Sequence, residues 1–308
     1  MLKPLNLGDK NFLSSYDLNK DEILHILSLA KLFKNKDLEI NLQNKVLGLV
    51  FDKASTRTRV SFQVAMTRLG GTCIDLNPNT SQIGRGEPIK DTARVLSKYC
   101  DVLAIRTFDH NNLEEYAKWS SIPVINALTD LEHPCQALAD FFTIQNNFGD
   151  FNNLVFTFIG DGNNVSHSLI LCGAILGVEI RIATPRGLEP NPVIIEKAKF
   201  IYKNDNLLKI FNDPILAASG ANVIYTDVWS SMGEEMQKTQ KDSRFEGFTI
   251  DSSLVKHANK DAIILHCLPA YRGKEITDEI IDSKNSRIFE QAENRLHVQQ
   301  ALLSCLLS

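Results

Sequence analysis

Short apolar runs alternate with stretches of helical periodicity along almost the whole chain. The short runs, which predict buried strands, are Val46–Phe51, Thr72–Leu76, Val102–Arg106, Val124–Asn126, Leu154–Ile159, Glu179–Ala183, Leu208–Phe211, Val223–Thr226 and Ala262–His266. The stretches with apolar residues at helical spacing are Asp21–Lys34, Thr58–Leu69, Ile89–Tyr99, Leu113–Trp119, Val165–Leu176, Pro192–Tyr202, Ile276–Asp282 and Arg287–Leu306. Because strands that alternate with helices pair in parallel and are covered on both faces, the pattern predicts an α/β fold with parallel sheets flanked by helices.

A polar stretch, Gln145–Asp150, separates two such alternating series. A chain of 308 residues is long enough for two domains with separate cores. We therefore expect two tandem domains, residues 1–148 and 149–287, with the C-terminal helix at 288–308 packing back on the first. Because ligands of open parallel sheets bind beyond the carboxyl ends of the strands, the active site is expected in the cleft between the two domains.

The turn after the first predicted strand concentrates hydroxyl and guanidinium groups. Ser55, Thr56, Arg57, Thr58 and Arg59 stand where a helix is predicted to start. A helix N-terminus has unpaired backbone N–H groups and partial positive charge, so these residues predict an anion site suited to phosphate. The alternative is a helix cap beside solvated arginines, but so many hydroxyls and arginines together favour the anion site. Arg59, one step further along the helix, is interpreted as structural.

Three more polar side chains follow other strands of the first half. Arg106 ends a buried strand, where its charge needs either a carboxylate of the protein or an oxygen of a ligand. His133 and Gln136 flank Pro134, which suits the first turn of a helix. Beside two arginines, His133 is a candidate donor to a carbonyl oxygen, and Gln136 can hold an amide through donor and acceptor together. Cys135 is interpreted as packed.

The segment Ser81–Glu87 is polar, contains two glycines and precedes another predicted helix. Most such segments are flexible connections. The alternative is a lid that contributes Gln82 or Arg85 to a site, including the site of a neighbouring subunit.

In the second half, three more residues are candidates for a functional site. Asp227 follows a predicted strand and could hold an α-amino group. Cys267 follows the last predicted strand, a position that exposes it more than the other cysteines. Arg295 lies on the C-terminal helix, from which it could point into the cleft.

The segment Gly160–Val165 follows a predicted strand and opens a helix, which is the context of a dinucleotide site. Val165 replaces the third glycine of that motif, and the next strand ends in Ala183 and Thr184 rather than in an acid for ribose. We therefore favour a small-molecule role for Asn164 over a nucleotide site.

Charge and composition exclude several classes of partner. The net charge is -4 and the basic residues form no long run, which argues against nucleic acid. No apolar run approaches the roughly 20 residues of a membrane span, and the first residues do not form a secretory signal, so cytoplasmic residence is expected. The six cysteines have no metal-ligand spacing, which argues against a structural zinc.

Taken together, several short motifs resemble those of the aspartate/ornithine carbamoyltransferase family, and of its ornithine branch in particular. They follow the family's order over nearly the whole chain and are Ser55-Thr56-Arg57-Thr58, Arg106-Thr107, His133-Pro134-Cys135-Gln136, Asp227 with Ser231-Met232-Gly233, His266-Cys267-Leu268-Pro269 and Glu293-Asn294-Arg295. The departures are slight: Asp52 stands where Glu is common, and Tyr271 where another residue is common.

The resemblance implies transfer of the carbamoyl group of carbamoyl phosphate to the side-chain amine of L-ornithine, giving L-citrulline and phosphate. It implies a first domain that binds carbamoyl phosphate and a second that binds ornithine. The implied carbamoyl phosphate residues are Ser55, Thr56, Arg57, Thr58, Gln82, Arg106, His133, Gln136, Cys267, Leu268 and Arg295. The implied ornithine residues are Asn164, Asp227, Ser231 and Met232. Arg106, His133 and Cys267 are the implied catalytic residues.

The family further implies a homotrimer or a multiple of trimers, in which Gln82 reaches a neighbouring site, and no metal or organic cofactor. Other interpretations are a transcarbamylase for putrescine, aspartate or an acylated ornithine, a nucleotide-binding dehydrogenase, and a non-catalytic binder on the same fold. The sequence does not show whether the enzyme works in arginine biosynthesis or in the reverse direction, where ornithine is regenerated from citrulline.

Overall fold

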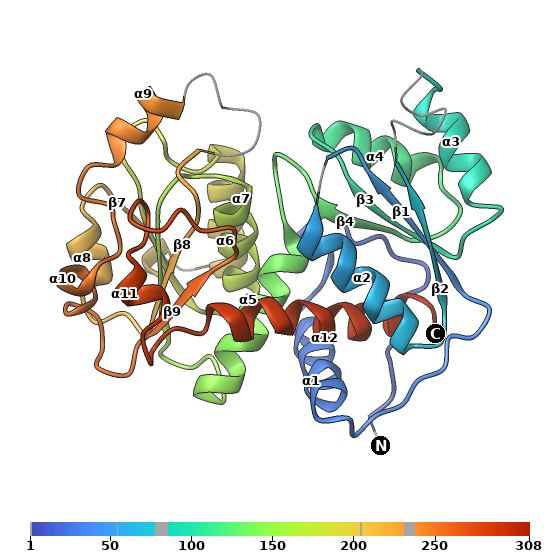
Figure 1. Ribbon diagram of the computed structural model, residues 1–308, viewed down its shortest axis with the longest axis horizontal. Helices are drawn as coiled ribbons and strands as arrows, with labels where there is room; N and C mark the ends of the chain where they lie inside the picture. Colours follow the sequence, from blue (N-terminus) through green and yellow to red (C-terminus); the bar gives the residue numbers. More distant parts are fainter. Residues whose placement is uncertain (1, 54, 78–85, 204, 231–237) are drawn as a thin grey trace. The chain divides into compact units, whose positions relative to one another are not determined.

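Two parallel sheets organise the structure, a computed structural model that describes residues 2–53, 55–77, 86–203, 205–230 and 238–308 (Figure 1). The chain forms two compact units. The first unit contains the chain up to Phe142 together with Glu293–Ser308, and the second contains Thr143–Ala292. The division at residues 148 and 287 that the sequence suggests stays a prediction.

The sheet of the first unit has the strand order β2-β1-β3-β4, with all pairs parallel. Its strands are β1 (Val46–Phe51), β2 (Thr72–Leu76), β3 (Val102–Arg106) and β4 (Val124–Leu128). The chain runs from β1 outward to β2 and then returns to β3 on the other side of β1, so a topological switch point lies between β1 and β3. Phe51 pairs with Arg106 there, which brings the turn after β1 beside the end of β3.

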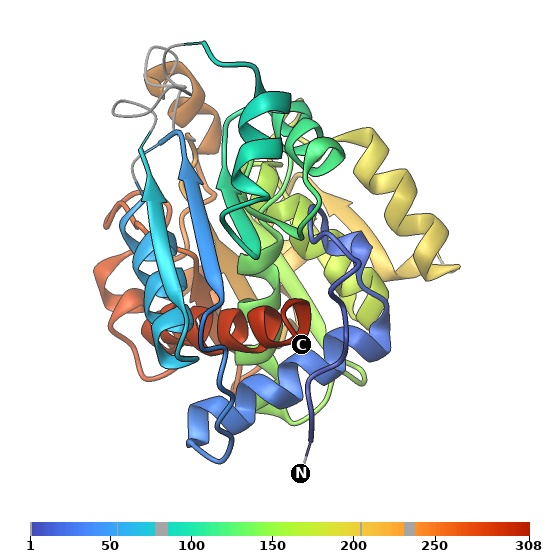
Figure 2. The same cartoon turned by 90° about the vertical axis from the view of Figure 1, so that its right-hand side faces the viewer.

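Helices cover both faces of this sheet, with α3 and α4 on one face and α2 on the other (Figures 1 and 2). The first four α-helices in the described part of this unit are α1 (Lys20–Asn35), α2 (Thr56–Arg68), α3 (Ile89–Leu96) and α4 (His110–Trp119). The core under α3 and α4 includes Val50, Leu103, Ile105 and Leu113, all buried. The side chain of Asn19 caps α1 by accepting from the Glu22 amide.

Two long helices each contribute residues to both units. They are α5 (Pro134–Phe148) and α12 (Ile288–Leu306). The polar stretch proposed as a boundary is helical up to Phe148. There the Asn147 side chain donates to the Thr143 carbonyl, one turn back along the helix.

The sheet of the second unit has the order β7-β6-β5-β8-β9, again with all pairs parallel. Its strands are β5 (Val155–Ile159), β6 (Glu179–Ala183), β7 (Leu208–Phe211), β8 (Val223–Thr226) and β9 (Ile263–His266). The switch point lies between β5 and β8. Residues that follow β5, β8 and β9 therefore meet at one edge of the sheet.

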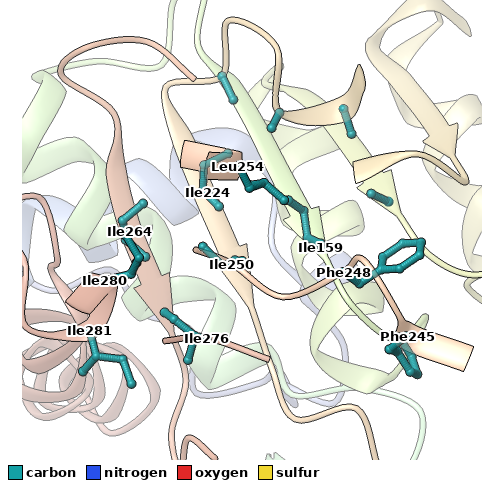
Figure 3. Close-up of a cluster of buried hydrophobic side chains, with 14 of the residues drawn as sticks. Ile159, Ile224, Phe245, Phe248, Ile250, Leu254, Ile264, Ile276, Ile280 and Ile281 are labelled. Atoms are coloured by element: carbon teal, nitrogen blue, oxygen red, sulfur yellow. The ribbon is translucent and has the colours of Figure 1, made fainter. Parts of the chain in front are cut away.

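A cluster of apolar side chains fills one face of this second sheet (Figure 3). Ile224 and Ile264 project from the strands toward Leu254, Ile280 and other buried residues. The helices of this unit, besides α5 and α12, are α6 (Asn164–Leu176), α7 (Pro192–Tyr202), α8 (Pro214–Ala218), α9 (Lys238–Asp242), α10 (Ser252–Val255) and α11 (Asp278–Ile281).

The predicted fold class of two parallel sheets flanked by helices is confirmed. All the predicted strands form within the described residues, and only the ends of β4, β5 and β9 differ from the expected bounds. The short helices α8, α9 and α10 were not predicted, because four or five residues are too few to show a helical period. Among the described helices, none combines the length and apolar composition that a membrane span requires.

Candidate active site

The first turn of α2 carries the predicted phosphate residues. The helix begins at Thr56, so Ser55 is its N-cap residue, yet the Ser55 side chain makes no capping hydrogen bond. Its hydroxyl instead accepts from Nη1 of Arg106 at 3.3 Å. Because Ser55 does not occupy the first-turn N–H groups, this helix start keeps the donors that an anion site needs. The interpretation of these residues as a simple helix cap is not supported.

Arg106 is buried at the end of β3, with 6% of its surface exposed. The sequence left two partners open for Arg106, a carboxylate of the protein or an oxygen of a ligand. In the described part of the chain no carboxylate forms an ion pair with Arg106, which favours the ligand oxygen. Burial and the nearby Arg295 and Arg57 guanidinium groups lower the pKa of Arg106 to about 10. Three guanidinium groups therefore share one region of the first unit, and an anion would relieve their mutual repulsion.

Arg295 connects the remaining residues of this region. Its Nη2 donates to the Thr58 hydroxyl at 3.2 Å, and its Nη1 donates to Oε1 of Gln136. Its Nη1 also lies 3.5 Å from Nε2 of His133. Thr58, His133, Gln136 and Arg295 are each at most 5% exposed. Residues from α2, from the start of α5 and from α12 thus form one hydrogen-bonded group, which we call the Arg295 cluster.

His133 is a neutral imidazole in this cluster. Burial, together with the positive charges of Arg295 and Arg106, lowers its pKa well below the usual 6.5. A neutral ring keeps one N–H donor and one acceptor nitrogen. The neighbouring Cys135 is fully buried and its thiol donates to the Asn126 carbonyl at 3.4 Å, in agreement with a packing role.

In the second unit, Asp227 collects hydrogen bonds from three places at the strand ends. Its Oδ1 accepts from the Val228 amide at 2.8 Å and from the Cys267 thiol at 3.0 Å, and its Oδ2 accepts from Nδ2 of Asn163 at 2.9 Å. Asp227 is 6% exposed. The residues that follow β5, β8 and β9 therefore converge on one buried carboxylate.

Asn163 belongs to this site and was not predicted from the sequence. Its Oδ1 caps α6 by accepting from the Val165 and Ser166 amides, while its Nδ2 holds Asp227. The helix begins one residue before the helical pattern read from the sequence, so the asparagine in the cap position is Asn163 and not Asn164. Asn164, which was predicted instead, is the first residue of α6 and is partly buried.

The glycine motif before α6 serves chain packing. The Gly162 amide donates to the Leu188 carbonyl at 2.9 Å, and a Cβ at Gly162 would lie 2.4 Å from the backbone of Glu189 and Pro190. This close approach of the backbone explains why a glycine stands at position 162 without a bound nucleotide. It agrees with the sequence analysis, which disfavoured a nucleotide site here.

A buried histidine shapes the turn that carries Cys267 and Leu268. The Leu268 amide donates to Nδ1 of His266 at 2.8 Å, which leaves Nε2 of His266 to donate to the Glu275 carboxylate at 3.2 Å. The same carboxylate accepts from the Tyr271 amide at 2.6 Å. Asp227, His266 and Cys267 offer possible metal-ligand atoms within 4.8 Å of one another. A metal there would have to replace the Leu268 and Cys267 hydrogen bonds.

The structure thus brings together the predicted residues in two groups. The first unit gathers Ser55, Thr58, Arg106, His133, Gln136 and Arg295, with Thr56 and Arg57 on the first turn of α2. The second unit gathers Asp227 and Cys267, with Leu268 next in the turn. Gln82, Ser231 and Met232 lie outside the described residues. That Cys267 and Leu268 also bind carbamoyl phosphate stays a prediction.

Comparison with known proteins places these two groups in context. The carbamoyl-P binding domain of aspartate/ornithine carbamoyltransferases matches residues 10–146, and the Asp/Orn binding domain of the same enzymes matches residues 152–306. An ornithine carbamoyltransferase of Prochlorococcus marinus is 75% identical over 308 residues, covering 100% of both chains.

Solved structures agree. The ornithine carbamoyltransferase of Pyrococcus furiosus has a TM-score of 0.94 at 45% identity and covers 98% of both chains. The anabolic ornithine carbamoyltransferase of Campylobacter jejuni has a TM-score of 0.91 at 45% identity, covering 97% of this chain and 98% of its own. Both domain models and full-length relatives of this identity lead to one assignment: the chain belongs to the aspartate/ornithine carbamoyltransferase family.

Proposed function

We propose that the protein transfers the carbamoyl group of carbamoyl phosphate to the side-chain amine of L-ornithine, with L-citrulline and phosphate as products. The observation that carries this proposal is the Arg295 cluster, in which buried Thr58, His133 and Gln136 surround one guanidinium beside Arg106. Full-length relatives that are ornithine carbamoyltransferases support it.

The residues of the first unit suit the two places where negative charge develops. As the amine attacks the carbamoyl carbon, charge grows on the carbonyl oxygen, and charge then moves to the leaving phosphate. Donors fixed at these positions lower the barrier more than they tighten substrate binding. Arg106, His133 and Thr58 are assigned to the oxygen, while Arg57 and the α2 N-terminus are assigned to the phosphate. An arginine fork holds phosphate oxygens in pairs, which a lysine cannot do.

Neutral His133 is suited to this role because it donates a hydrogen bond without adding a fourth positive charge. Gln136 retains one lone pair on Oε1 and one hydrogen on Nε2 beyond its present bonds. These remaining positions are the ones with which Gln136 would hold the carbamoyl amide.

The amine half of the reaction is assigned to the second unit. Asp227 would hold the α-amino group of ornithine, with Asn164, Ser231 and Met232 as further contacts. The Asp227 carboxylate is fixed by three hydrogen bonds, so its position is set before a substrate arrives. An acid and a thioether suit ornithine, whereas aspartate would require cationic residues for its second carboxylate.

The attacking amine must lose its proton before it can react. With a lysine-like pKa of about 10.4, the neutral form costs about 4.6 kcal/mol at pH 7. A Cys267 thiolate would give up its hydrogen bond and face the Asp227 carboxylate at 3.0 Å. We therefore assign Cys267 and Asp227 to orienting the amino acid, and the guanidinium groups of Arg57 and Arg106 to disfavouring the ammonium form.

The proposal extends to assembly and cellular role. We infer a homotrimer or a multiple of trimers in which Gln82 reaches the site of a neighbouring subunit, as the family resemblance implies. A cytoplasmic location fits six cysteines that form no disulfide bond with one another. A role in arginine biosynthesis is suggested by the 45% identity to the anabolic enzyme of Campylobacter jejuni.

A substrate comparison tests the function. The protein is expected to form citrulline from carbamoyl phosphate and ornithine, with kcat/KM for putrescine or N-acetylornithine at least about a hundredfold lower, because each analogue leaves buried polar groups unpaired. Product formation is measured for each amine at equal concentration. Equal or faster use of putrescine or N-acetylornithine would assign the site to that amine, and no product from any amine would leave only the non-catalytic binder.

Replacement of Cys267 by serine tests its orienting role. In Cys267→Ser we expect a raised KM for ornithine and an altered pH profile, with kcat at saturating ornithine and high pH remaining within about tenfold of the wild type, since a serine hydroxyl can still donate to Asp227. Steady-state kinetics over a range of pH measures both quantities. Complete loss of turnover under those conditions would show that the thiol itself performs the chemistry.

The neutral state of His133 predicts a pH-dependent stability. Below the unfolded pKa of 6.5, the unfolded chain takes up a proton that folded His133 refuses, so stability falls as the pH falls. His133→Gln is expected to remove this loss, which amounts to up to about 1.4 kcal/mol per pH unit. Urea unfolding between about pH 7.5 and about pH 5.5 measures the difference.

The exposed His257, changed to glutamine, is the matched control for the stability measurement. Burial also lowers the pKa of His297, and this histidine is retained in both variants. A wild-type dependence on pH in His133→Gln would mean that His133 is not held neutral.

A further inference from the structure

A buried carboxylate lies directly behind the Arg295 cluster. Asp140 is on α5, one turn after Gln136, and is fully buried. Nε2 of Gln136 donates to Oδ1 of Asp140 at 2.7 Å. Hydrogen bonds therefore run without a break from Asp140 through Gln136 and Arg295 to the Thr58 hydroxyl.

The two partners of Gln136 impose the same orientation on its amide. A carboxylate only accepts hydrogen bonds, so the amide nitrogen must face Asp140, and a guanidinium only donates, so the amide oxygen must face Arg295. Rotating the amide by half a turn would set donor against donor at Arg295 and acceptor against acceptor at Asp140. Asp140 thus fixes the far end of the Gln136 amide in the orientation that presents the amide oxygen to the Arg295 guanidinium.

The same carboxylate bears on the charge of the site. Arg57, Arg106 and Arg295 are close enough to disturb one another, since two of them contribute to the lowered pKa of the third. A charge-assisted hydrogen bond such as that from Gln136 to Asp140 is stronger than a neutral one and polarises the bonds that follow it. A negative charge at the far end of this chain therefore stabilises the guanidinium at its near end.

We propose that Asp140 is a positioning residue for carbamoyl transfer, which holds the Gln136 amide and, through it, the Arg295 guanidinium in the orientation that meets the developing charge. Asp140 does not touch the substrate. The inference rests on the proposed function, and it adds a residue outside all the sequence motifs that suggested that function.

Asp140→Asn tests the proposal, because it preserves shape and removes charge. We expect kcat to fall about tenfold to a hundredfold, in keeping with the loss of a charge-assisted hydrogen bond. The KM for ornithine should change less than about twofold, since ornithine is assigned to the second unit. Thr143→Val, a change of similar size to another buried polar residue on α5, is the matched control and should keep wild-type kinetics.

A double-mutant cycle separates positioning from general destabilisation. Once Gln136→Ala has cut the connection, Asp140→Asn should change kcat by less than about twofold further. Kinetics are measured together with thermal unfolding of each variant, so that folded protein is compared with folded protein. If Asp140→Asn does not fold, Asp140→Glu carries the test instead. This variant moves the carboxylate by one methylene, which weakens its hydrogen bond to Gln136 and should lower kcat at least about threefold.

Three results would overturn the inference: wild-type kcat in folded Asp140→Asn, wild-type kcat in Asp140→Glu where that variant carries the test, or an Asp140→Asn effect that is undiminished in the Gln136→Ala background. A wild-type protein that makes no citrulline would instead refute the proposed function. The two failures are therefore distinguishable in one set of assays.

Discussion

A guanidinium group cannot stay in a protein interior unless its charge is held by hydrogen bonds, and the first unit is built around one such group. Arg295 is 5% exposed and bonds to Thr58 and Gln136, which lie far away in the sequence. Leaving a buried charge without partners is strongly destabilising. The need to satisfy Arg295 therefore ties α12 to the start of α2 and the start of α5, and the site exists because those three segments meet.

The parallel sheets make this meeting possible. Ser55 follows β1 and Arg106 ends β3, the two strands that flank the switch point of the first unit, and Asn163, Asp227 and Cys267 follow β5, β8 and β9 of the second. Parallel pairing brings the carboxyl ends of these strands to one edge, so side chains separated by many residues become neighbours. The polar residues at the edges then bond to one another: Arg106 to Ser55, and Cys267 and Asn163 to Asp227.

Much of this could be predicted from the sequence, and the limits have physical causes. Strand positions were predictable because buried parallel strands are continuous apolar runs. Arg106 stands out because it ends such a run, and Ser55 and His133 because each precedes the start of a helix that follows one. Asp140 and Asn163 were not predicted. Asp140 lies within the helical pattern of α5, where nothing local distinguishes a functional carboxylate from any other, and its importance appears only when Arg295 is seen to meet Gln136.

The central claim is that the Arg295 cluster binds carbamoyl phosphate, and equilibrium binding of that compound tests it most directly. Calorimetric titration of the full-length wild type and of Arg295→Met, without any amine present, compares the two affinities. The account predicts binding at least about tenfold weaker in the variant, as expected for charge-assisted hydrogen bonds, with ornithine affinity and thermal stability measured alongside. Carbamoyl phosphate affinity that is unchanged in folded Arg295→Met would contradict it.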